Sequence, residues 1–147
     1  MQPHRVAVVV YGLVNFEAYF KGREIAEGLR ARDLVRYPHL ETTYKYFTSF
    51  RPVYRSNLIR LTAMVNEELR SMVSELSRDL ADNVNVQVRY SDALATADLS
   101  RAELLHAVDG WHASAEGHNV LAEAAFSDLG PSLQFLGIKS PPSDSRN

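Results

Sequence analysis

The chain has 147 residues, 46% of them hydrophobic and 23% charged, with a formal net charge of -2. This length suffices for one domain with its own core, and the near-neutral charge without a basic stripe argues against a nucleic-acid partner. The chain contains no cysteine, which excludes disulfides and thiolate metal sites.

The longest apolar run near the start is Val6 to Val10. It is far shorter than the roughly 20 residues that a membrane-spanning helix needs. It is also too short for the core of a signal peptide, and the following Asn15-Phe16-Glu17 is not a cleavage region. We therefore expect no membrane span. The localisation stays open, because the chain as written carries no export signal but a full-length form could be secreted.

The first half of the chain predicts a strand followed by helices. The run from Val6 to Tyr11 is apolar on both faces, which is typical of a strand buried between helix layers in a parallel sheet. A helix is expected from Glu17 to about Leu34, weakened by Gly22 and Gly28. Residues 36–51 are rich in aromatic side chains, and we interpret them as an irregular connection that covers core edges rather than as a ligand platform.

The clearest helix begins near Pro52, a residue favoured at the first helical position. Apolar residues follow at spacings of three and four, which predicts one amphipathic helix packed on a core. These residues are Leu58, Leu61, Val65, Leu69, Met72 and Leu76. The opposite face carries both signs of charge, unlike a helix that lies on a membrane. A partner-binding role for this helix remains the alternative.

The second half predicts a strand, a connection and a final helix. Asp82 and Asn83 close the long helix, and residues 84–90 alternate apolar with polar, as expected for a strand with one covered face near a sheet edge. Residues 91–108 form a connection with a short helical turn around 100–106. Ser114 suits the N-cap of a last helix, which Gly130-Pro131 ends. The inner stripe of this helix comprises Val120, Leu121, Ala124, Ala125 and Leu129.

This order of elements predicts an α/β layered protein with a mainly parallel sheet. We expect the domain to cover residues 1–130. Residues 131–147 are expected to form a C-terminal tail whose last part, 140–147, is disordered.

Asp109 and His112 stand three residues apart in a loop that precedes a capped helix. At this spacing the carboxylate can accept a hydrogen bond from one imidazole nitrogen and leave the other free to act as a base. Trp111 between them could shield the pair from water. The loop follows a strand, and open α/β sheets present functional groups at the carboxyl ends of their strands.

Residues 109–118 read D-x-x-H-x-S-x-x-G-H, and this block resembles the last conserved block of the SGNH (GDSL-type) ester hydrolases. The family usually has proline where this chain has Ala113. The order of the elements from Val6 to Leu129 is similar to the second half of that fold. The resemblance thus implies a partial flavodoxin-like three-layer α/β/α domain, the C-terminal half of an SGNH hydrolase fold.

The resemblance also implies a reaction, the hydrolysis of a carboxylic ester through an acyl-serine intermediate without metal or cofactor. His112 would be the general base and Asp109 its orienting carboxylate. The chain contains no Gly-Asp-Ser block for the nucleophile, so we expect it to be inactive alone, as a truncated reading frame or one part of a split gene. Asn15, three residues after Gly12, is similar to the family's oxyanion asparagine, although Phe16 replaces the aspartate that should follow.

Three alternatives stay open. A metal could use Asp109, His112 and His118 as ligands. No second strong carboxylate joins them, however, and His106 lies in a weakly defined loop. A serine within the chain, Ser91 or Ser114, could act as the nucleophile. The third alternative is a non-catalytic α/β interaction module. The partners expected under the leading hypothesis are an ester substrate and the missing N-terminal half, with no nucleic acid.

Overall fold

The protein is a mixed α/β chain with a sheet of two parallel strands. Its computed structural model describes residues 4–33, 52–105 and 112–139. Strand β1 (Val6–Tyr11) pairs in parallel with β2 (Val86–Ser91), from Val6 opposite Val86 to Tyr11 opposite Ser91. The expectation of a parallel sheet is therefore confirmed for these two strands.

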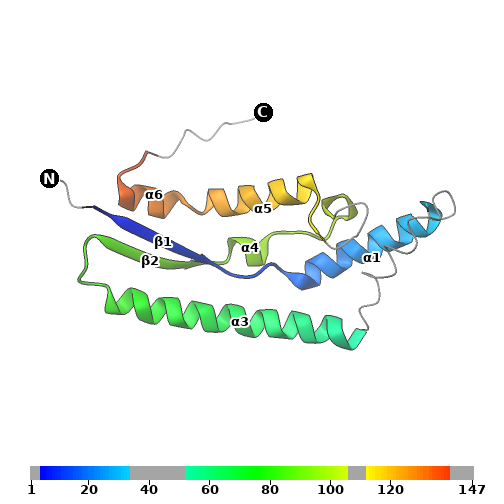
Figure 1. Ribbon diagram of the computed structural model, residues 1–147, viewed down its shortest axis with the longest axis horizontal. Helices are drawn as coiled ribbons and strands as arrows, with labels where there is room; N and C mark the ends of the chain where they lie inside the picture. The colour runs from blue at the N-terminus through cyan, green and yellow to red at the C-terminus, as the bar shows by residue number, and fades with distance from the viewer. Residues whose placement is uncertain (1–3, 34–51, 106–111, 140–147) are drawn as a thin grey trace.

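The described residues form helices between the two strands and after the second strand (Figure 1). They are α1 (Phe16–Asp33), α3 (Pro52–Asp79), α4 (Ala93–Thr96), the short 3-10 helix η2 (Ala102–Leu104), α5 (Ala115–Ser127) and α6 (Gly130–Leu136). The predicted start of the long helix at Pro52 is confirmed, as are the first helix and the helical turn within residues 100–106.

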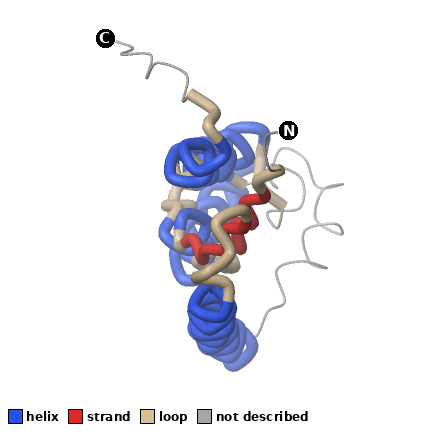
Figure 2. Tube along the Cα trace, turned by 90° about the vertical axis from the view of Figure 1, so that its left-hand side faces the viewer, coloured by secondary structure: helices blue, strands red, loops and turns tan. Residues whose placement is uncertain are grey.

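Helix α3 lies on one face of the two strands, and α5 with α6 lies on the other (Figures 1 and 2). Side-chain alternation agrees with this arrangement. The Tyr11 hydroxyl donates to the Ala125 carbonyl of α5 at 2.9 Å, whereas the guanidinium of Arg70 in α3 lies 5.0 Å from the ring centre of Tyr90. Val6 and Val8 are an odd number of positions from Tyr11 and lie opposite Val86 and Val88, which share a face with Tyr90, so they face the α3 side. A flavodoxin-like fold requires a wider sheet than these two strands and stays a prediction.

The main buried cluster lies beyond the ends of the strands, where α1 meets the segment that runs into α5 (Figure 1). Its members are Tyr19, Phe20, Leu99, Leu104 and Leu105. The Tyr19 and Phe20 rings meet edge to face with centroids 5.7 Å apart. The main buried cluster therefore lies next to the start of α5 rather than at the centre of the sheet.

The expectation that β1 is buried on both faces is wrong for its first half. Val6 and Val8 are 51% and 44% exposed, whereas Val88 on β2 is 7% exposed. The difference arises because α3 packs under β2 and leaves the same face of β1 uncovered.

The expected end of the last helix at Gly130-Pro131 is also wrong. Helix α5 ends at Ser127 with Asp128 as its C-cap, and Gly130 and Pro131 form the first turn of α6. Proline acts here as a start signal, because its missing N–H costs nothing in a first helical turn. Helix α6 packs on β1, so the segment expected to be a tail begins with ordered structure.

Several sequence-based expectations fall outside the described residues. They concern the aromatic connection 36–51, His106, Asp109, Trp111 and the end of the chain from 140. Within the described ranges, no helix combines the length and the apolar character that crossing a bilayer requires.

Candidate functional site

The first turn of α5 is fixed by Ser114, as its N-cap position predicts. Its hydroxyl oxygen accepts a hydrogen bond from the backbone N–H of Gly117 at 3.1 Å and donates to the carbonyl of Glu103 at 2.6 Å. The backbone N–H of Ser114 donates to the carbonyl of Leu104 at 2.8 Å. The start of α5 is thereby tied to η2, and the predicted cap is confirmed.

Gly117 allows this close approach. A Cβ atom at this position would overlap the Leu104 carbonyl oxygen and lie 3.1 Å from its carbon. Any other residue would push α5 away from η2. The serine and the glycine of the S-x-x-G part of the block therefore each have a structural role. The serine caps the helix, and the glycine lets the helix lie close to η2.

His112 lies in the loop immediately before α5, and its side chain is exposed. The neighbouring Ala113 forms an antiparallel bridge with Leu105, which fixes the backbone next to the histidine. His118 is exposed on the first turn of α5. Asp109, the expected partner of His112, lies outside the described residues, so the distance between the two side chains stays untested.

Asn15 forms the N-terminal cap of α1. Its side-chain oxygen accepts hydrogen bonds from the backbone N–H groups of Glu17 at 2.9 Å and Ala18 at 3.2 Å. A cap of this kind uses the amide oxygen. An oxyanion role would use the amide nitrogen, so the cap and that role would use different atoms of the same side chain.

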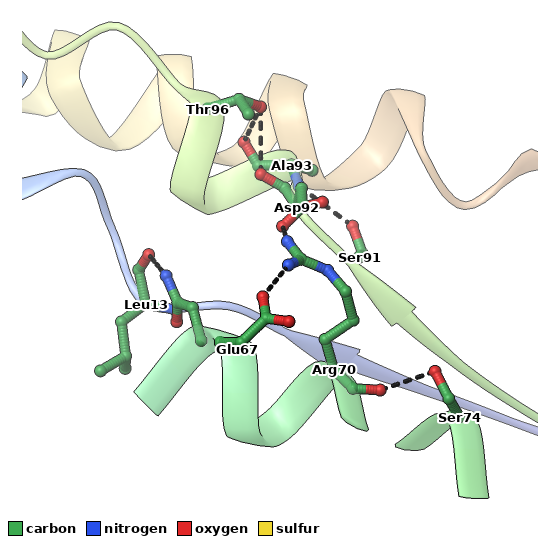
Figure 3. A network of polar contacts seen from close by, with 9 residues as sticks. Leu13, Glu67, Arg70, Ser74, Ser91, Asp92, Ala93 and Thr96 are labelled. Carbon is green, nitrogen blue, oxygen red and sulfur yellow. Dashed lines mark hydrogen bonds and ion pairs between the residues drawn. The ribbon is translucent and has the colours of Figure 1, made fainter. Parts of the chain in front are cut away.

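A polar network that sequence reasoning missed lies where β2 ends (Figure 3). The guanidinium of Arg70 contacts the carboxylates of Glu67 at 2.5 Å and Asp92 at 2.6 Å, and it lies over the ring of Tyr90. Asn66, one turn earlier on α3, binds both backbone groups of Leu13, at 2.7 Å and 3.1 Å. The sequence feature that could have indicated this network is Asp92, a carboxylate placed directly after a parallel strand.

The electrostatics of this network favour a charged arginine and a neutral tyrosine. The hydrogen bond to Asp92 raises the pKa of Arg70. Burial raises the pKa of Tyr90, and the charge of Asp92 raises it further. An open hollow beside Asp92 reaches from Tyr90 to Thr96 and Asp128. Nothing in this set forms a nucleophile with an adjacent base, so we interpret the network as a link between α3 and the end of β2.

A second polar cluster joins β2 to the turn between α5 and α6. Arg89 donates from Nη1 to the carboxylate of Asp128 at 2.7 Å, from Nη2 to the backbone carbonyl of the same residue, and from Nε to the Ser132 hydroxyl at 2.9 Å. The pKa of Asp128 is lowered by its hydrogen bond with the Ser91 hydroxyl and by Arg89. Burial acts in the opposite direction, but its effect is smaller than the combined effect of these two neighbours. This cluster holds α5 and α6 on the sheet.

No group of three or more metal-binding side chains occurs within residues 4–33, 52–105 and 112–139. The fold defines a mixed α/β protein. Comparisons with protein-family models, with curated proteins and with solved structures each give no match to this chain. The resemblance to SGNH hydrolases therefore stays a prediction from the sequence of residues 109–118 and from the order of the elements.

Proposed function

We propose that this chain is the C-terminal part of an SGNH-type serine ester hydrolase, with His112 as its general base and Asp109 as the carboxylate that orients the histidine. The nucleophilic serine would come from a stretch that these 147 residues do not contain. The complete sheet would then be the flavodoxin-like, mainly parallel sheet that the resemblance implies.

The observation that carries the proposal is the construction of the turn behind His112. Ser114 and Gly117, both part of the D-x-x-H-x-S-x-x-G-H block, anchor α5 on η2 through the carbonyls of Glu103 and Leu104. A general base needs a backbone held in place by its surroundings. This anchoring supplies such a backbone two residues away from the exposed histidine.

The position of this turn supports the same proposal. Both strands run toward the side of the molecule where the loop before α5 lies (Figure 1). In open parallel sheets, ligands bind beyond the carboxyl ends of the strands. An ester that reaches His112 would approach from that side.

The chemistry follows from the triad. His112 accepts the serine proton as the serine oxygen forms a bond to the ester carbonyl carbon. It then returns that proton to the leaving alcohol as the ester C–O bond breaks. Water, activated by the same histidine, releases the acid and regenerates the serine. The 147 residues alone are expected to show no such activity, because removal of the nucleophile costs about a million-fold in rate.

The test begins with the DNA upstream of the Met1 codon, translated in all three forward frames. A Gly-Asp-Ser block in frame, or one frameshift away, is the expected result. The joined protein should then hydrolyse p-nitrophenyl acetate and react with a fluorophosphonate probe. H112A should lower kcat/KM by a factor on the order of 10⁴ to 10⁶. H118A is the matched control, because His118 is also exposed near the start of α5.

Two results would contradict the proposal. One is an upstream sequence without a nucleophile block. The other is a joined protein in which H112A and H118A hydrolyse the ester equally well. Fluorophosphonate labelling of the 147-residue chain itself would point instead to a serine such as Ser91.

A second candidate, a non-catalytic α/β interaction module, is favoured by a separate observation. Helix α3 exposes a row of large apolar side chains, and β1 exposes Val6 and Val8. Intact folding with equal esterase activity in H112A and the unsubstituted joined protein would support this candidate.

A further inference from the structure

We draw no further inference here: the strongest candidate, the exposed apolar row of α3 together with the uncovered face of β1 beside it, carries nothing, because nothing in the part of the chain that the structure describes shows what covers this surface.

Discussion

Gly117 in the first turn of α5 lies directly against the carbonyl oxygen of Leu104, with no space for a side chain between them. The same carbonyl accepts the backbone N–H of Ser114 at 2.8 Å, and Leu104 is fully buried. The start of α5 and the end of η2 therefore behave as one packed unit. This unit sets the position of His112.

The first prediction concerns this contact. G117A should lower the free energy of unfolding by about 1–3 kcal/mol, as overpacking of a tight contact does. Urea unfolding followed by circular dichroism measures the effect. G130A is the matched control, because a Cβ at Gly130 would meet nothing within 4 Å, and alanine in a helix should be neutral or slightly stabilising. Equal effects of the two substitutions would contradict the contact.

The second prediction concerns the two hydrogen bonds of the Ser114 hydroxyl. S114A should lower the free energy of unfolding by about 1 kcal/mol, the usual contribution of an N-cap. The loss should be larger if the hydrogen bond to the Glu103 carbonyl also contributes. S114T retains a hydroxyl that can both accept and donate, so it should recover most of the loss. Thermal and urea unfolding measure both. A threonine variant as unstable as the alanine variant would argue against the capping geometry.

Local signals in the sequence predicted much of the fold. Pro52 marked the start of α3, Ser114 marked the cap of α5, and the two strands were found within two residues of their observed bounds. These predictions succeeded because a cap or a first-turn proline acts through its immediate neighbours. No long-range contact is needed to recognise it.

Long-range contacts account for what the sequence did not predict. From the sequence, Gly22 was expected only to weaken α1. In the structure, a Cβ at this position would lie 2.5 Å from the carbonyl oxygen of Leu99, so the glycine lets a distant segment pack on the helix. The exposure of Val8 depends on α3 lying under β2. Likewise, the pairing of Arg70 with Asp92 joins residues whose proximity only the fold determines.

The third prediction uses the depressed pKa of Asp128, which the Ser91 hydroxyl and Arg89 lower. A carboxylate with a lowered folded-state pKa stabilises the protein fully above its unfolded-state pKa of about 3.9. The contribution is lost as the pH falls through the lower folded-state pKa. D128N should therefore be less stable at pH 7, by on the order of 1 kcal/mol given the partial exposure of the side chain. The difference should shrink as the pH falls through the lowered folded-state pKa of Asp128.

Urea unfolding of the unsubstituted protein and of D128N between pH 2.5 and pH 7 measures this dependence. D82N is the matched control, because Asp82 is an exposed aspartate in the turn before β2. A constant difference between D128N and the unsubstituted protein across this range would contradict the assignment. A difference of the same size in D82N would attribute it to net charge alone.

The fourth prediction separates two roles of Asn15. N15A should destabilise the chain by about 1 kcal/mol, because it removes the acceptor for the N–H groups of Glu17 and Ala18. N15D should keep the cap, since aspartate accepts the same bonds and its charge suits a helix N-terminus. It removes the amide N–H donor that an oxyanion site would need. Urea unfolding checks the stability part, and an N15D variant as unstable as N15A would contradict the capping role.

The activity part uses the joined esterase, in which an oxyanion role for Asn15 predicts that N15D lowers kcat by about 10²- to 10³-fold while stability is unchanged. KM should change little, because the donor acts on the charge that develops in the transition state. An unchanged kcat in N15D would leave Asn15 with the cap as its whole role, and the oxyanion donors would then have to come from the upstream segment.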